Sequence, residues 1–292
     1  MSHPIKHSGL IAILLAATPV CSTQAKITDA PESHSFLVKS DDNQIAGELI
    51  VMDGTVPETV IIVVGGSGAV LREDTRQAVP LFLNASTAVA LVDRRGNGDS
   101  TGDYKRPSTT NSEWQIPKIG SDTADVATYL STYGFDHVGV AGSSMGGWIA
   151  ASAASQTEDI DFVIGLVGGV VSVATSDIFD GATDTGLSIP DAMIKAQQPH
   201  ELTSYDPKSD LTSMTQPGLW ILTEKDTSNP SFLDIERLKT FKEKGYPYDY
   251  ILVPNADHNM TDVESGAFNG SWIEPMGTFI QTSRDANRSS ER

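Results

Sequence analysis

The chain has 292 residues, a length that suits one large α/β domain. It carries 20 Lys and Arg against 38 Asp and Glu, which gives a formal net charge of −18. This negative charge argues against partners such as nucleic acid or anionic membrane surfaces, and a solvated acidic exterior explains it most simply. It says little about the substrate.

The first 25 residues predict a signal peptide for export. Lys6 supplies the positively charged start, residues 9–17 the apolar stretch, and residues 23–25 a small-residue cleavage site. Because the apolar stretch is too short to cross a bilayer, we expect no stable membrane span. The sequence therefore predicts a periplasmic or secreted protein. A lipoprotein anchored through Cys21 is the alternative, although the residues before Cys21 form a poor approach to a lipidated cysteine.

Cysteine and metal chemistry are not expected in the mature chain. Cys21 is the single cysteine, and cleavage after Ala25 removes it, which excludes disulfides and thiolate catalysis. The sequence contains no H-E-x-x-H motif, EF-hand loop or clustered set of His and carboxylate residues. We therefore expect neither a metal nor another cofactor.

Eight apolar runs predict strands. The first two flank residues 41–43, whose Asp-Asp-Asn sequence is a hairpin signal. The runs after residue 58 are nearly continuous in Val, Ile and Leu, as expected for parallel strands that are buried on both faces. The expected strands are 35–39, 45–51, 59–64, 87–92, 137–141, 162–167, 219–223 and 248–253.

Helical patterns alternate with these strands. Apolar residues recur at helical spacing over 123–130, 233–244 and 273–280. The alternation predicts an α/β domain over residues 26–292, with a mostly parallel eight-stranded sheet and flanking helices. We expect the polar tail, residues 282–292, to be frayed.

Residues 172–213 interrupt the alternation. This segment is polar and irregular, with a short candidate helix over 189–196. It lies between two expected strands, where an insertion would cover the carboxyl edge of the sheet. Long structured loops of this kind are usually functional, so we interpret the segment as a small cap rather than as a plain surface excursion.

The pentapeptide G-x-S-x-G occurs twice. Residues 142–146 follow an expected strand and precede a small, apolar, helix-like run, the setting in which a sharp strand-to-helix turn presents a nucleophilic serine. The glycines matter because side chains at those positions would collide in the turn. Residues 98–102 are followed by polar residues and a proline, so Ser100 is interpreted as a loop residue. Ser144 is the candidate nucleophile.

A serine hydroxyl becomes a good nucleophile only when an adjacent base removes its proton. His258 follows the last expected strand, so its loop starts at the carboxyl edge of the sheet, where Ser144 is expected. The other histidines beyond the signal peptide are placed elsewhere: before the first strand, at the amino end of a strand, and in the cap. They are His34, His137 and His200. His258 is therefore the candidate base.

The base in turn needs a carboxylate that orients its ring and stabilises its positive charge. Asp226, shortly after the expected strand 219–223, is the first choice and Glu224 the runner-up. Asp257 is disfavoured because the side chains of adjacent residues point apart. The chain order Ser144, Asp226, His258 is the order found in nucleophile-elbow hydrolases.

Such chemistry also needs two backbone N–H groups that face the developing oxyanion. The amide of Met145, directly after the nucleophile, is the first candidate. The second is expected in the glycine-rich loop 65–68, and we choose the amide of Ser67. The loop lacks a lysine at Walker spacing, which argues against a nucleotide phosphate as its ligand.

Several segments together carry a family resemblance. They are 66–68 with Arg72 and Asp74, then 93–102, 142–147, 206–207 before Pro217, 224–226 and 257–258. On these segments the chain resembles the α/β-hydrolase superfamily over essentially its whole mature length. It is most similar to bacterial exported esterase-like hydrolases related to the serine aminopeptidase and prolyl-oligopeptidase branch. The resemblance implies that residues 93–102 order the loop beside the site. Gly65 departs from the pattern, since the family often has histidine there.

These observations predict a serine hydrolase that cleaves small carboxylic esters through an acyl-enzyme formed on Ser144. A peptidase or amidase with the same three residues, acting on a short peptide or amide, is the first alternative. Ester cleavage is preferred because we find neither an added β-propeller sequence nor a dedicated acidic recognition motif. A non-catalytic binding protein with this fold is the second alternative. The sequence does not predict the oligomeric state or the identity of the substrate.

Overall fold

The structure is a computed structural model that describes residues 31–68 and 70–290. The predicted signal peptide, residues 1–25, lies outside the described residues, so export stays a prediction.

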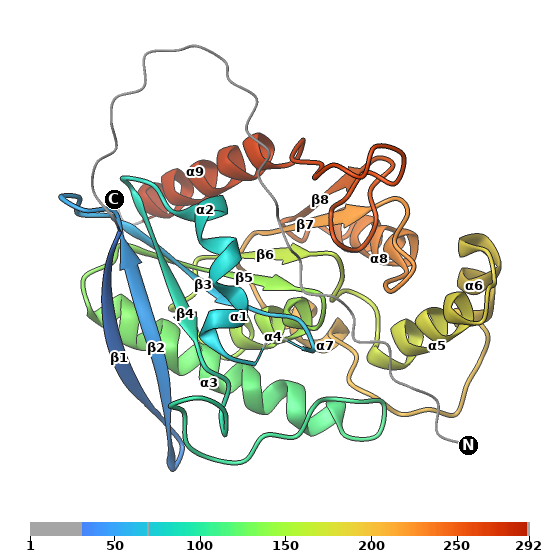
Figure 1. Ribbon diagram of the computed structural model, residues 1–292, viewed down its shortest axis with the longest axis horizontal. Helices are drawn as coiled ribbons and strands as arrows, with labels where there is room; N and C mark the ends of the chain where they lie inside the picture. The colour runs from blue at the N-terminus through green and yellow to red at the C-terminus, as the bar shows by residue number, and fades with distance from the viewer. Residues whose placement is uncertain (1–30, 69, 291–292) are drawn as a thin grey trace.

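In the described part of the chain, an eight-stranded sheet has the order β1-β2-β4-β3-β5-β6-β7-β8 (Figure 1). The β1–β2 and β2–β4 pairs are antiparallel and the remaining pairs are parallel. The predicted mostly parallel eight-stranded sheet is therefore confirmed. Its strands are β1 (Glu32–Ser40), β2 (Asn43–Val51), β3 (Thr59–Val64), β4 (Thr87–Val92), β5 (His137–Ser143), β6 (Phe162–Leu166), β7 (Gly218–Thr223) and β8 (Tyr248–Val253).

The central strands are buried on both faces. All six residues of β3 are buried, and their side chains alternate between two hydrophobic clusters. Val60 and Ile62 belong to one cluster and Ile61 and Val63 to the other. Such two-sided burial explains why the parallel strands appear in the sequence as continuous Val and Ile runs rather than as alternating ones.

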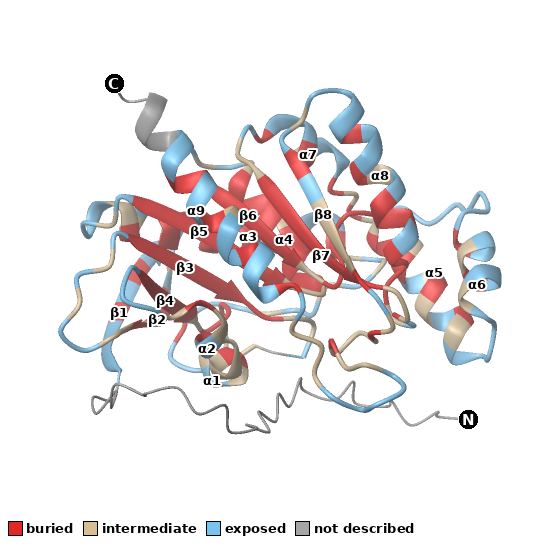
Figure 2. Cartoon of the chain, turned by 90° about the horizontal axis from the view of Figure 1, so that it is seen from above, coloured by how far each residue is buried: buried red, intermediate tan, exposed pale blue. Residues whose placement is uncertain are grey.

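Helices cover both faces of the sheet (Figures 1 and 2). Residues of α3, α4, α7 and α8 pack in the larger cluster, and residues of α2 and α9 pack in the smaller one on the opposite face. The helices are α1 (Arg72–Thr75), α2 (Val79–Phe82), α3 (Ser112–Thr132), α4 (Met145–Ala154), α5 (Val173–Asp184), α6 (Ile189–Ala196), α7 (Lys208–Ser213), α8 (Ser231–Glu243) and α9 (Ile273–Ser290), with a 3₁₀ turn at Arg76–Ala78. Within the described residues, no helix has both the length and the apolar character that a bilayer crossing requires.

Two helices extend beyond their predicted bounds. Helix α3 begins eleven residues before the predicted helix at 123, because tertiary packing overrides the helix-breaking tendency of Pro117 inside it. The expectation of a frayed tail from residue 282 was wrong, since α9 continues to Ser290. Ser283 and Arg284 are buried there, and the Arg284 guanidinium bonds to Glu58 at 2.7 Å. The contact between Arg284 and Glu58, just before β3, thus helps to keep the polar end of α9 helical, although its sequence has no strong helical signal.

The segment between β6 and β7 holds three helices, of which α5 and α6 pack together at one side of the molecule (Figure 1). Their apolar residues form a separate small cluster with Leu233 of α8. The indole N–H of Trp148 in α4 donates to the carbonyl of Val171 at 2.7 Å, which fixes the start of this segment to α4. Helix α5 was not predicted because its sequence is rich in Thr, Asp, Ser and Gly.

Candidate active site

Ser144 stands at the sharp turn between β5 and α4. Its backbone has φ 55° and ψ −119°, a conformation that is strained for a residue with a side chain. The Ser144 amide donates to the carbonyl of Leu166 at the end of β6, with an N···O distance of 2.7 Å. The turn is thus held from the neighbouring strand, and Ser144 stays partly exposed while Met145 after it is buried.

The glycines of the turn are required by close backbone packing. A Cβ atom on Gly142 would lie 2.0 Å from the Gly146 carbonyl oxygen, and one on Gly146 would lie 2.3 Å from the oxygen of Val64. Neither contact is relieved by a side-chain movement, because both partners are backbone atoms. The G-x-S-x-G spacing therefore reflects how tightly the first turn of α4 sits against the ends of β3 and β5.

Ser100, from the second G-x-S-x-G, occupies a different environment. Its hydroxyl is buried, donates to the Asp93 carbonyl at 2.8 Å and accepts from the Ala46 amide at 2.8 Å. The first bond lies within the loop after β4, and the second joins that loop to β2. The interpretation of Ser100 as a structural loop residue is confirmed.

Asp226 and His258 meet at the carboxyl edge of the sheet. They follow β7 and β8, which are adjacent parallel strands. Nδ1 of His258 lies 2.8 Å and 3.0 Å from the two carboxylate oxygens of Asp226. The Asp226 side chain is fully buried, whereas the exposed fraction of the His258 side chain is 22%. A buried carboxylate thus holds a partly accessible imidazole in one orientation.

Other partners lock the Asp226 carboxylate in place. Its Oδ1 atom accepts the backbone N–H groups of Ser228 and Asn229, both at 2.8 Å. The Asn229 side chain donates to Asp234 at 2.7 Å, and Asp234 also accepts the Val171 amide at 2.8 Å. Burial raises the pKa of Asp234 to about 7. Asn229 and Asp234 were not predicted from the sequence, because no local pattern indicates that Asp234 in α8 and Asn229 just before it support the loop.

The pKa of His258 reflects opposing effects. Burial is the largest single effect and lowers it, but the negative charge and hydrogen bond of Asp226 lead the opposing effects, which together raise the pKa above its ordinary value. The charges of Asp180 and Asp257 add to this rise. Asp180 lies in α5, so the segment between β6 and β7 contributes negative potential at the imidazole.

The remaining acid candidates have other partners. Glu224 accepts the Asn255 amide at 2.8 Å and pairs with Lys225 at 3.0 Å. Asp257 accepts the amides of Asn259 and Thr261, which shapes the loop that carries His258. The structure thus places Asp226, the first choice of the sequence analysis, against the imidazole.

The other histidines of the described residues lie on strands or in the segment between β6 and β7, and none of them bonds to this pair. His34 is on β1 with a half-exposed side chain near Glu32, and His137 is buried at the amino end of β5. His200 is exposed in the segment before α7.

The two predicted oxyanion donors belong to segments that meet at Ser144. Met145 is the first residue of α4. Ser67 lies in the loop after β3, which passes next to Ser144: a Cβ atom on Gly66 would lie 3.3 Å from Ser144 Cβ and 3.8 Å from its Oγ. Met145 directly follows Ser144 in the chain, and Ser67 directly follows Gly66, which lies beside Ser144.

Within the described residues, no hydrogen bond joins the Ser144 hydroxyl to His258. Nδ1 of the imidazole is engaged by Asp226, which leaves Nε2 as the nitrogen available to a reacting hydroxyl. Catalytic hydrogen bonds are often long in unliganded enzymes. The pairing of Ser144 with His258 thus stays a prediction. Over the same part of the chain, no group of three His, Cys, Asp or Glu residues is arranged to hold a metal ion.

The model of the prolyl oligopeptidase family matches residues 74–284. The chain belongs to this family. It is accordingly a serine hydrolase with the α/β-hydrolase fold, as the resemblance implied. The search of curated proteins gave no significant match.

Solved structures of an esterase and of two peptidases share this fold at low sequence identity. An esterase of Pyrococcus furiosus is 16% identical with a TM-score of 0.61, over 86% of this chain and 93% of the esterase. A proline iminopeptidase of Mycobacterium smegmatis is 15% identical with a TM-score of 0.57, over 87% and 100% of the two chains. An acylaminoacyl peptidase of Pyrococcus horikoshii is 17% identical with a TM-score of 0.61, over 88% of this hydrolase but 42% of the peptidase.

The electrostatics of the pair predict how His258 titrates. In Asp226→Asn the carboxylate charge is lost, so the pKa of His258 should fall below that of the wild type, measured by NMR titration of the imidazole. Asp180→Asn should lower it by less. Glu224→Gln is the matched control in the same loop as Asp226 and should leave the titration unchanged. An unchanged pKa in Asp226→Asn contradicts the arrangement.

Proposed function

We propose that this serine hydrolase cleaves carboxylic esters at a site formed by Ser144, His258 and Asp226. In this proposal Ser144 is the nucleophile, His258 the general base, and Asp226 the group that fixes the ring tautomer and stabilises the imidazolium. The amides of Met145 and Ser67 are the proposed oxyanion donors.

The proposed reaction has two steps. His258 Nε2 takes the Ser144 proton as the hydroxyl oxygen attacks the carbonyl carbon, and the resulting tetrahedral oxyanion collapses when His258 protonates the leaving alcohol. The acyl group is then bonded to Ser144. In the second step His258 removes a proton from water, which attacks the acyl-enzyme, and the carboxylic acid leaves as Ser144 regains its proton. No redox or metal step is needed.

One observation carries the proposal: the hydrogen bond between a fully buried carboxylate, Asp226, and the Nδ1 atom of His258. A buried charge is unfavourable unless it is paired and hydrogen-bonded, so this geometry is costly to maintain for structure alone. The Asp226–His258 pair lies at the edge of the sheet where β5 ends in the strained turn at Ser144. This position supports a role for the imidazole as a base.

Amide or peptide cleavage is the second candidate function, and one observation favours it. Asp180 of the cap segment is close enough to raise the pKa of His258, so a carboxylate borders the proposed site. Such a group would attract the amine of an aminoacyl substrate. We prefer ester cleavage because an alcohol leaves more readily than an amine. The small cap further supports a short or medium acyl group.

We also propose that the enzyme is exported, as residues 1–25 indicate. The N-terminus of the secreted or periplasmic protein, identified by mass spectrometry, should then be Lys26. A mature protein that begins at Met1 contradicts this proposal.

A fluorophosphonate probe should label the wild-type enzyme on Ser144. Ser144→Ala should abolish labelling and lower kcat by about 10³–10⁶-fold without unfolding, because the remaining groups form no covalent intermediate. His258→Ala should lower kcat over the same range. Ser100→Ala removes a serine from the same pentapeptide and is the matched control, which should still be labelled. Folded wild-type protein that resists labelling would favour a non-catalytic binding protein.

A substrate panel should separate the two candidate functions. We expect kcat/KM to be higher for p-nitrophenyl esters of short and medium acyl length than for aminoacyl p-nitroanilides. Higher values for the anilides, together with a loss confined to them in Asp180→Asn, would instead identify a peptidase or amidase.

A further inference from the structure

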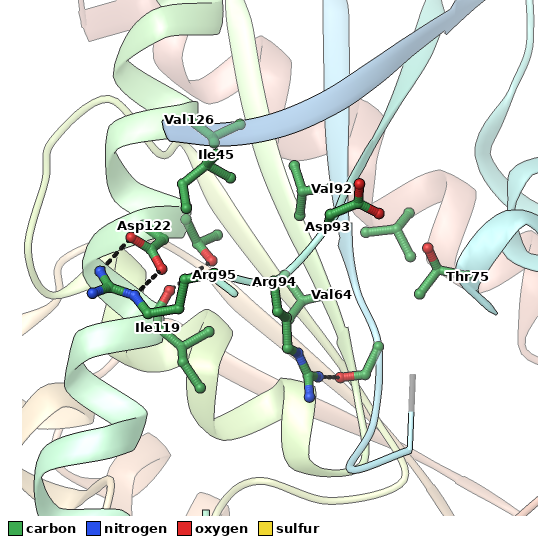
Figure 3. Close-up of a pocket in the computed structure, with 13 residues that line it drawn as sticks. Ile45, Val64, Thr75, Val92, Asp93, Arg94, Arg95, Ile119, Asp122 and Val126 are labelled. Carbon is green, nitrogen blue, oxygen red and sulfur yellow. Dashed lines mark hydrogen bonds and ion pairs between the residues drawn. The ribbon is translucent and has the colours of Figure 1, made fainter. Parts of the chain in front are cut away.

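Arg94 is a buried cation that the proposed chemistry does not yet use. It follows β4 at the same edge of the sheet as Ser144, and 5% of its surface is exposed. The next residue, Arg95, is also buried, but the two side chains diverge (Figure 3). Arg95 forms an ion pair with Asp122 at 2.5 Å, whereas Arg94 points toward the loop after β3.

The Arg94 guanidinium bonds to two backbone carbonyls and one tyrosine hydroxyl. Its Nη2 atom donates to the oxygens of Gly65 and Gly66, the latter at 2.8 Å, and Nη1 lies 3.3 Å from the Tyr104 hydroxyl. No ion pair joins it to a carboxylate in residues 31–68 and 70–290. Burying a guanidinium without a counter-ion is costly, and Arg95 shows the usual structural solution beside it. Two of its hydrogen bonds go to the carbonyls of one loop, and the only carboxylate that acts on its charge in the described part of the chain, that of Asp74, does so from a distance without an ion pair.

Those two bonds determine where the loop amides point. A trans peptide is planar, so its C=O and N–H bonds point in opposite directions, and no cis peptide occurs among the described residues. Since Arg94 holds the Gly65 and Gly66 carbonyls, the N–H groups of Gly66 and Ser67 are turned away from the guanidinium. A Cβ atom on Gly66 would lie 3.8 Å from Ser144 Oγ, so the loop passes beside the nucleophile at this residue.

The loop cannot maintain this orientation through its own side chains. Three of its four residues, Gly65, Gly66 and Gly68, are glycines, for which many backbone orientations are accessible. A rotated Gly66–Ser67 peptide would replace an N–H donor near the nucleophile with a carbonyl oxygen. A charged donor that binds both carbonyls in a buried site opposes this rotation strongly.

We propose that Arg94 is a positioning residue that orients the Ser67 amide toward the oxyanion of the acyl-transfer reaction. This inference rests on the proposed function, because the oxyanion forms only if Ser144 attacks a carbonyl. Arg94 contacts no reacting atom and acts through the loop peptides.

The test compares Arg94→Met and Arg94→Lys with the matched control Arg95→Lys. For p-nitrophenyl acetate, Arg94→Met should lower kcat/KM by about 10–100-fold through kcat, with KM changed less than about twofold, because a misplaced oxyanion donor weakens the transition state alone. Its affinity for phenylboronic acid, which forms a tetrahedral anion on the serine, should fall by a similar factor. Arg94→Lys retains one charged donor and should recover part of both losses.

Arg95→Lys alters the adjacent buried arginine and its ion pair, so it should lower the melting temperature while kcat/KM and boronate affinity stay near wild type. A folded Arg94→Met protein with wild-type kcat/KM overturns the inference, and so does a kcat loss with unchanged boronate affinity. If Arg94→Met does not fold, Arg94→Lys decides by the same two readouts. If the wild-type enzyme neither hydrolyses the ester nor reacts with the fluorophosphonate, the proposed function itself is refuted. If the wild-type enzyme is active and the Arg94 variants are equally active, only the role of Arg94 is refuted.

Discussion

Close contact between the first turn of α4 and the ends of the central strands is the constraint on which the site depends. The carbonyl of Val64 comes so near to Gly146, and the carbonyl of Gly168 so near to Gly147, that a side chain at either glycine has no room. The helix can start this close to the sheet only if the chain reverses within one residue. Ser144 is that residue, which explains its positive φ. The strain is local, and a well-packed layer of buried residues in α4 compensates for it.

Hydrogen bonds and charges also fix the positions of side chains at the same edge of the sheet. The carboxylate of Asp226 is held by two backbone N–H groups and by the imidazole, and Asn229 connects its loop to Asp234 in α8. Asp234 also binds the Val171 amide at the entry to the cap segment. The acid, its loop and the start of the cap thus share one buried hydrogen-bond network. Such a network fixes geometry because any unpaired member would be left buried without a partner.

On the other side of Ser144, the loop after β3 is held by Arg94 and by contacts of the segment after β4. The Arg94 amide donates to the Val70 carbonyl, and the Asp93 carboxylate accepts the Arg72 amide at 2.8 Å. Residues 93–102, which were expected to order the loop beside the site, therefore contact it directly. The two charged systems, around Asp226 and around Arg94, flank the nucleophile from opposite sides in the strand order.

The sequence by itself determined the strands, their parallel arrangement and the residue types of the site. Continuous Val and Ile runs have no alternative to burial on both faces, and G-x-S-x-G requires a turn that excludes side chains. It did not determine the length of α9, the presence of α5, or the partners Asn229, Asp234 and Arg94, because their roles come from contacts between residues far apart in the chain. Only the tertiary structure decided that Asp226 rather than Glu224 meets His258. The reason is geometric: β7 and β8 end side by side, and the turn after β7 directs one carboxylate inward and the other toward Asn255 and Lys225.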